Sequence, residues 1–140
     1  MALPQISSEH RQALARILRA VTADLLATQL QLRQLHWNVQ GPNFITLHEL
    51  FDTLSNAAKD AADEVAERAL ALGFPVVAEP ASIASGQSLA KLPEGFLTDR
   101  RALSAALEIV SALTAAMRGH LPAAADADPV TEDLLIGTLA

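Results

Sequence analysis

The sequence predicts an all-α protein whose helices form a four-helix bundle. Two observations lead to this fold class. Apolar residues recur every three or four positions over long stretches, which is the spacing of a helix with one buried face. Proline and glycine, which are costly inside helices, gather in four places: residues 41–42, 73–80, 86–95 and 119–129. The 140 residues, 51% of them hydrophobic, suffice for a single domain spanning residues 1–140.

The first two predicted helices are the longest. The first runs from about Ser8 to about Val39, with Ser7 or Ser8 as N-cap. The residues of its buried face are spaced alternately four and three positions apart: Leu14, Leu18, Val21, Leu25, Thr28, Leu32 and Leu35. The second runs over about 43–72 and ends at Gly73, a residue typical of a helix C-cap. Both helices are much longer than the average of about eleven or twelve residues.

A second pair of helices follows a long connection. Residues 74–97 are rich in Pro, Gly, Ser and Ala and form a crossover that holds one short helix around 82–90. The third long helix is expected over about 98–119, and the fourth begins at Asp128-Pro129, a good capping pair. This order predicts a ferritin-like four-helix bundle with the short helix between helices 2 and 3. The fourth helix, which reaches Ala140 in about twelve residues, is unusually short for such a bundle.

Composition excludes several classes of protein. The absence of cysteine rules out disulfide frameworks, thiolate metal sites and cysteine nucleophiles. The N-terminus lacks the basic segment and apolar run of a signal peptide. The sequence also contains no stretch of about 18 apolar residues, the length needed to span a membrane. We therefore expect a cytoplasmic protein with no membrane partner. The net charge of −6 makes nucleic acid an unfavoured partner.

Candidate metal ligands gather around the break between the first two helices and along the second. His36, Trp37 and His48 lie close together in the sequence. At 100° per residue from His48, three acids fall within about 100° on the same helix face: Asp52, Asp63 and Glu67. Imidazole and carboxylate groups suit iron or manganese. A solvated acidic face is the other interpretation, because charged stripes on helices usually face water.

Axial distance places these ligands in two groups. Asp52 and Asp63 are separated by about 16 Å along a helix, whereas metal–ligand distances are about 2 Å. If the helix packs against an antiparallel copy of itself, His48 and Asp52 of one subunit face Asp63 and Glu67 of the other, as a two-fold interface requires. No Glu is followed by His three positions later, which disfavours a di-iron site within one bundle. The sequence thus favours metal sites shared between subunits.

The segment HWNVQGPNFITLHELFD, from His36 to Asp52, followed by Asp63 and Ala66-Glu67-Arg68, resembles the Dps family of mini-ferritins. The resemblance extends in outline from about Ser8 to Ala140 and includes residues 130–137. It implies a homododecameric shell with a dinuclear iron ferroxidase centre at each two-fold interface. Carried over residue by residue, it implies three ligands from one subunit, His36, His48 and Asp52, and two from its mate, Asp63 and Glu67.

The implied reaction is oxidation of Fe(II), preferably by hydrogen peroxide, with storage of ferric oxide in the shell and protection against oxidative damage. Trp37 lies beside the centre in such proteins. It is either a redox-active ring or an aromatic residue of the subunit interface. A DNA-compacting scaffold without enzymatic activity and a purely structural helical oligomer are the alternative functions.

Several charged residues lie outside this motif. Four acids near the fourth helix either line a pore that admits iron or favour the helix dipole: Asp126, Asp128, Glu132 and Asp133. The second interpretation is preferred for Asp128, as a cap, and for Glu132. His10 and His120 are treated as surface residues, and Arg11, Arg16 and Arg19 as a solvated face. Because Met1–Ser7 contains no Lys or Arg, DNA binding should be weak or absent.

Overall fold

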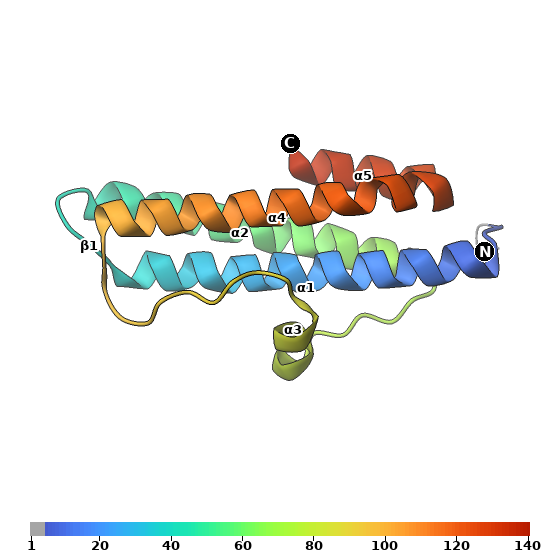
Figure 1. Cartoon of the computed structure of the whole chain (residues 1–140), viewed down its shortest axis with the longest axis horizontal. Helices are drawn as coiled ribbons and strands as arrows, with labels where there is room; N and C mark the ends of the chain where they lie inside the picture. The colour runs from blue at the N-terminus through green and yellow to red at the C-terminus, as the bar shows by residue number, and fades with distance from the viewer. Residues whose placement is uncertain (1–4) are drawn as a thin grey trace.

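The computed structural model describes residues 5–140; residues 1–4, part of the N-terminal segment without Lys or Arg, lie outside the described residues. The bundle consists of two helical hairpins (Figure 1): α1 (Ser8–Asn38) with α2 (Phe44–Ala71), and α4 (Asp99–Ala127) with α5 (Pro129–Leu139). The partners of each hairpin run antiparallel, and a long crossover joins the hairpins. The predicted all-α bundle with ferritin-like connectivity is confirmed, and α5, with 11 residues, is the short fourth helix.

The ends of the first hairpin follow the predicted capping signals. Ser7 is the N-cap of α1, and its hydroxyl accepts a hydrogen bond from the His10 amide at 3.1 Å. At the end of α2, Gly73 adopts a φ of +84°, and the Phe74 amide donates to the Ala69 carbonyl at 2.8 Å. A residue with a Cβ rarely adopts this backbone conformation, so the glycine ends α2 where the sequence predicts.

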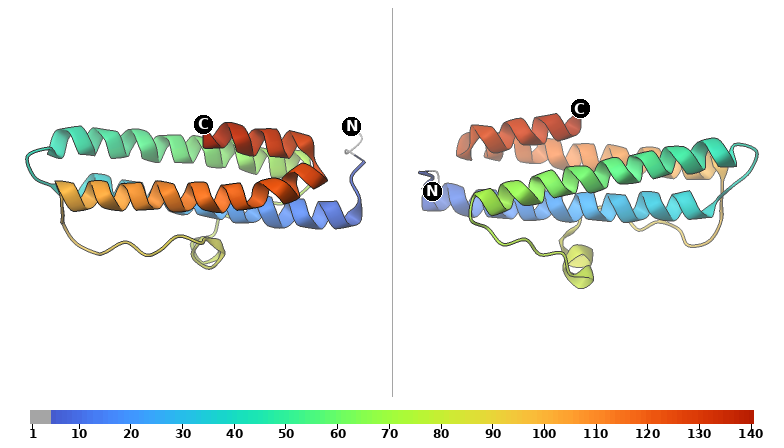
Figure 2. Two further views of the ribbon diagram at one scale, coloured as in Figure 1. Left: turned by 45° about the horizontal axis from the view of Figure 1, so that its top comes forward. Right: turned by 180° about the vertical axis from the view of Figure 1, so that it is seen from behind.

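The short helix of the crossover, α3 (Pro80–Gly86), lies outside the bundle against α1 (Figure 2). It begins and ends earlier than the predicted 82–90. Pro80 fits its first turn, where no amide hydrogen is needed. After Gly86, the Ser88 amide donates to the buried carboxylate of Asp24 at 2.6 Å and not to a helical carbonyl. This tie to α1 ends the helix.

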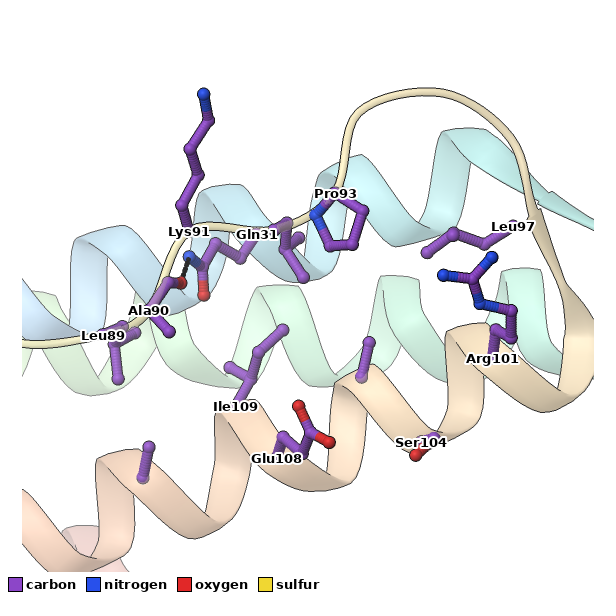
Figure 3. Close-up of a pocket in the computed structure, with 13 residues that line it drawn as sticks. Gln31, Leu89, Ala90, Lys91, Pro93, Leu97, Arg101, Ser104, Glu108 and Ile109 are labelled. Atoms are coloured by element: carbon purple, nitrogen blue, oxygen red, sulfur yellow. Dashed lines mark hydrogen bonds between the residues drawn. The ribbon is translucent and has the colours of Figure 1, made fainter.

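A pocket of about 250 Å³ lies between the crossover, α1 and α4 (Figure 3). Gln31 of α1 closes one side, because its Nε2 donates to the Ala90 carbonyl at 2.8 Å. Arg101 and Glu108 of α4 line the opposite side. The Gln31 bond, like that of Asp24, fastens the crossover to α1, away from the predicted metal ligands.

Two very short strands, β1 (Val39–Gln40) and β2 (Leu97–Thr98), pair in parallel and were not predicted. Val39 lies opposite Leu97, and both side chains are buried. Two residues are too few to show the alternation that identifies a strand in a sequence. The pair joins the end of α1 to the start of α4.

The prediction that the third long helix ends near Gly119 is wrong, because α4 continues through Pro122 to Ala127. Proline has no amide hydrogen, so the carbonyl of Arg118 loses its helical donor. Met117 and Ala124, on either side of Pro122, are both buried in the core and offset this loss. The helix ends only at Asp128, the N-cap of α5.

The bundle core consists of two apolar clusters, one around Phe51 and one around Met117. Among the described residues, α4 is the helix that is long and apolar enough to cross a membrane, and 22% of its most apolar 18-residue stretch is buried. The same helix contributes Ala102, Ile109 and Met117 to the core. The expectation that no segment crosses a membrane stays a prediction.

Candidate metal centre

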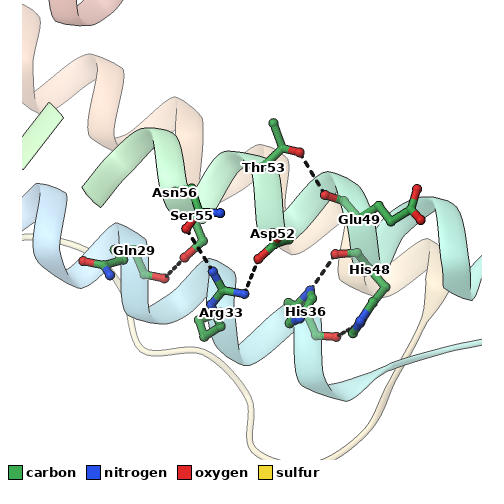
Figure 4. Close-up of polar contacts among 9 residues, drawn as sticks. All are labelled: Gln29, Arg33, His36, His48, Glu49, Asp52, Thr53, Ser55 and Asn56. Carbon is green, nitrogen blue, oxygen red and sulfur yellow. Dashed lines mark hydrogen bonds and ion pairs between the residues drawn. The ribbon is translucent and has the colours of Figure 1, made fainter. Parts of the chain in front are cut away.

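His36, near the end of α1, and His48, near the start of α2, form a reciprocal pair (Figure 4). Nδ1 of His36 lies 2.6 Å from the His48 carbonyl oxygen, and Nδ1 of His48 lies 2.7 Å from the His36 carbonyl oxygen. The two rings stack with centroids 3.6 Å apart and planes 17° from parallel. Phe44 stacks on His48 at 4.9 Å. The ring positions are therefore fixed within one subunit.

The reciprocal bonds determine which ring nitrogens remain free. A carbonyl oxygen can only accept a hydrogen bond, so Nδ1 of each histidine must carry the hydrogen. In the neutral ring the lone pair then lies on Nε2, the nitrogen available to a metal ion. A hydrogen bond on the other ring nitrogen also orients metal-binding histidines and raises their basicity. His36 and His48 thus have the chemistry of two oriented nitrogen ligands.

Asp52 lies one turn after His48 on α2. The Arg33 guanidinium on α1 donates to Asp52 Oδ1 through Nη1, and Nη2 donates to Asn56 Oδ1 at 3.4 Å (Figure 4). The hydrogen bond from Arg33, together with its positive charge, lowers the pKa of Asp52, although desolvation opposes the shift. Asp52 is therefore an ionised carboxylate at neutral pH, beside the histidine pair.

The loop that carries His48 into place is tied to the start of α4. Both the amide and Nδ2 of Asn43 donate to Asp99 Oδ2, at 3.3 and 3.0 Å. These bonds, with one from the Arg100 amide, lower the pKa of Asp99. Gly41 has a φ of +130°, and a Cβ at this position would come within 3.0 Å of the Asp99 carboxylate. The Gly41–Asn43 turn of the motif is thus required for close contact with α4.

Asp63 and Glu67 are exposed and lie further along α2. Within residues 5–140 no group of three or more His, Asp or Glu side chains lies close enough to hold a metal ion. One subunit places His36 and His48 in contact, with Asp52 one helical turn after His48, and Asp63 and Glu67 lie further along α2. Their pairing across a subunit interface stays a prediction. Trp37, 67% exposed next to His36, also keeps its two interpretations.

Arg33 and Asn56 are polar residues of this region that the sequence analysis missed. Arg33 precedes His36 by three residues, and Asn56 follows Asp52 by four. Both spacings place residues on the same helix face. This spacing could have identified both residues as neighbours of the predicted ligands. The packing of α1 on α2, which brings Arg33 to Asp52, cannot be predicted from the spacing.

Among the acids near α5, Asp128 is the N-cap that the sequence predicts. Its carboxylate accepts from the amides of Val130 and Thr131, at 3.3 and 3.2 Å, and pairs with Arg68 of α2. Asp128 is buried, and its role as a cap, the preferred interpretation, is confirmed. Asp133 is exposed and Glu132 partly buried, and their role at a pore is not tested by one subunit.

The remaining surface predictions need one correction. Arg11 is not a freely solvated residue, because Nη2 donates to the Leu72 carbonyl at 3.0 Å and the guanidinium lies 4.9 Å from the centre of the Phe74 ring. His10 Nε2 lies 3.2 Å from Asp126 Oδ2, so both residues join α1 to α4. Arg16 and Arg19 are exposed, as expected.

Comparison with known proteins gives the family. Residues 15–140 match the family model described as a ferritin-like domain. The DNA protection during starvation protein of Mycolicibacterium smegmatis is 31% identical over 96% of this chain and 73% of its own length. The chain belongs to the Dps family of ferritin-like proteins. The solved Dps from Microbacterium arborescens, described as in the high iron form, is 31% identical with a TM-score of 0.88, covering 98% of this chain and 89% of that one.

Within the Dps family the match differs in extent. The DNA protection during starvation protein 2 of Deinococcus radiodurans is 35% identical over 72% of this chain, which is only 42% of that protein's length. The structural match covers 98% of this chain in the Dps from Microbacterium arborescens, whereas the sequence match spans less than half the length of the Deinococcus radiodurans relative.

Proposed function

We propose that this chain is the subunit of a cytoplasmic ferroxidase and iron store. It oxidises Fe(II), preferably with hydrogen peroxide, at dinuclear sites shared between two subunits, and twelve copies form a shell that holds ferric oxide and limits oxidative damage. The observation that carries the proposal is the reciprocal His36–His48 pair, which leaves Nε2 of both rings free, with the ionised carboxylate of Asp52 one helical turn after His48.

Each proposed ligand has a defined role. His36, His48 and Asp52 of one subunit bind iron together with Asp63 and Glu67 of the mate. About 16 Å of helix separates Asp52 from Asp63, so an antiparallel copy of the helix is needed to bring both groups of ligands to one ion. Carboxylates are hard ligands and favour Fe(III) over Fe(II). They therefore make the bound Fe(II) easier to oxidise.

The reaction balances without a proton donor from the protein. Two Fe(II) ions each give one electron to one molecule of hydrogen peroxide, whose O–O bond breaks to form two hydroxide ions. Because both electrons come from neighbouring ions, no hydroxyl radical is released. Trp37 follows His36 in the chain and its side chain is 67% exposed, which leaves the ring free to act as a redox partner or to pack at the interface between subunits.

The charge of the chain supports iron uptake. Each subunit has a net charge of −6, which a closed shell multiplies, and such a field concentrates cations. Three acids near the α4–α5 corner remain the proposed lining of a pore: Asp126, Glu132 and Asp133. The same negative charge opposes DNA binding, and no described feature favours the scaffold function.

The test compares three forms of the protein after anaerobic addition of Fe(II) followed by peroxide. The wild type should consume about one peroxide per two Fe(II) ions, whereas His36→Ala, Asp63→Ala should fall to the rate in buffer alone. His120→Ala, Glu64→Ala removes an imidazole and a carboxylate elsewhere and should behave as wild type. Equal rates in all three would refute the ferroxidase and leave the structural oligomer.

Native mass measurement of the wild type tests the shell separately. A mass of about twelve subunits is expected from the family resemblance, and a dimer with full activity would retain the shared centre but exclude storage in a shell.

A further inference from the structure

Arg33 places a positive charge among the proposed iron ligands. Its guanidinium reaches from α1 to α2, where Nη1 donates to Asp52 Oδ1 and Nη2 lies 3.4 Å from Asn56 Oδ1 (Figure 4). The Arg33 side chain is 23% exposed and that of Asp52 45% exposed. The ion pair is thus formed in a single subunit, before any mate supplies further ligands.

A guanidinium and a metal ion compete for the same carboxylate oxygen, and each weakens the binding of the other. Arginine offers its donors in a planar fork and stays charged at all relevant pH values. A divalent ion at Asp52 would also lie within a few ångströms of this charge and be repelled by it. Arg33 donates to Oδ1 of Asp52, so an ion at this carboxylate either displaces the guanidinium or binds weakly at Oδ2, beside the positive charge.

The histidine half of the centre does not face this competition. His36 and His48 use Nδ1 for each other's carbonyl oxygens, and within residues 5–140 the hydrogen bonds of the Arg33 guanidinium go to Asp52 and Asn56 and not to either ring. An ion held mainly by a histidine Nε2 and by acids from the mate can bind while the Arg33–Asp52 pair is intact. The two iron positions of the proposed centre are therefore unequal.

We propose that Arg33 is a positioning residue that sets the order of loading: the first metal ion binds with Arg33 still on Asp52, and the second binds only when the guanidinium leaves that carboxylate. This inference rests on the proposed ferroxidase function. Asn56 holds the other arm of the fork, so the guanidinium is oriented toward Asp52 rather than free in solvent.

Calorimetric titration of the metal-free, assembled protein with Co(II), followed by visible absorption, separates the two binding steps. In Arg33→Gln the weaker step should tighten by about tenfold, since both the competitor and the repulsion are removed. Arg16→Gln removes the same charge from an exposed position on the same helix and should leave both steps unchanged. Unchanged binding in Arg33→Gln, or equal tightening in Arg16→Gln, would overturn the proposal.

Two further variants keep the test decisive. In an Asp52→Asn background, Arg33→Gln should have no effect, because the carboxylate for which Arg33 competes is gone. If Arg33→Gln does not assemble, Arg33→Lys serves instead. A lysine keeps the charge but lacks the rigid planar fork that fits Asp52 and Asn56 together. The weaker step should therefore tighten about threefold, and an unchanged step counts against the proposal.

The failure of this inference differs from that of the proposed function. Co(II) binding that is lost in His36→Ala, Asp63→Ala but identical in Arg33→Gln would retain the centre and refute only the role of Arg33. Binding that is absent in every variant, or indifferent to His36 and Asp63, would refute both.

Discussion

The corner between α4 and α5 depends on one carboxylate. Asp128 is 8% exposed and caps α5 through the amides of Val130 and Thr131. The Thr131 hydroxyl donates to the same carboxylate at 2.6 Å, and Arg68 of α2 pairs with it. Replacing Asp128 therefore removes a helix cap and leaves the Arg68 charge, 19% exposed, without its partner.

Two substitutions separate these losses. Asp128→Asn keeps a good N-cap residue but loses the ion pair, which at this partial burial should cost about 1–2 kcal/mol of unfolding free energy. Asp128→Ala loses the cap as well, worth about 1 kcal/mol, and should cost about 2–3 kcal/mol in total. Asp126→Ala, whose side chain is 80% exposed, is the matched control and should cost no more than about 0.5 kcal/mol.

The effect should depend on pH in a defined direction. Burial alone would raise the pKa of Asp128, but hydrogen bonds from Thr131 and Arg68 and the charge of Arg68 outweigh it, so the folded-state pKa is lowered. The unfolded chain then binds the proton more readily, and the stabilisation is present above the ordinary Asp pKa of about 3.9. It is lost as the pH falls through the folded-state pKa.

Urea unfolding followed by circular dichroism, at one fixed subunit concentration, measures these differences from pH 7 downward. The gap between wild type and Asp128→Asn should be full at pH 7 and shrink as the pH falls below about 4. An Asp128→Ala variant as stable as wild type at pH 7, or an Asp128→Asn gap that persists at the lowest pH, would refute this account of the corner.

Core packing, backbone conformation and surface charge can each be tested by one further experiment. Phe51→Ala empties a fully buried site and should cost about 3–5 kcal/mol by urea unfolding, whereas Ile45→Ala, 62% exposed, should cost less than about 0.5 kcal/mol. In Gly41→Ala a residue with a Cβ would have to adopt a positive φ close to the Asp99 carboxylate, so the unfolding free energy should fall by about 1–3 kcal/mol. Gly137→Ala has free space in α5 and should raise the unfolding free energy by about 0.5–1 kcal/mol. A higher melting temperature for Gly41→Ala than for Gly137→Ala would contradict this. No mobility shift of duplex DNA is expected even at low salt, and a shift that weakens steeply with salt would reverse that expectation.

Most of the fold was predictable because its boundaries lie at residues with strong backbone preferences. Ser7, Gly73 and the Asp128-Pro129 pair each act locally, and the helices begin or end there. The end of α4 was not predictable in this way. Burial of Met117 and Ala124 overrides the local cost of Pro122, and burial depends on neighbours that are distant in the sequence.

In the candidate site, too, local spacing was predictable and contacts between distant segments were not. The spacing of His48 and Asp52 on one helix face is a local property, and the structure places both beside His36. The bonds from each Nδ1 to a carbonyl across the hairpin leave no trace in composition or periodicity. Arg33 has the correct spacing from His36, but only the packing of α1 on α2 brings its charge to Asp52.

The same atoms complete the hairpin and prepare the centre. The His36 carbonyl lies in the last turn of α1, and its helical donor would be the amide of Gln40, which is already in β1. His48 Nδ1 supplies the missing donor, so the ring is fixed by the need to satisfy a helix end. A metal ion at Nε2 leaves that bond untouched, and the nitrogen ligands need no rearrangement on loading. Preorganisation of the histidine half is therefore a property of one subunit, and what assembly adds is the pair of acids, Asp63 and Glu67.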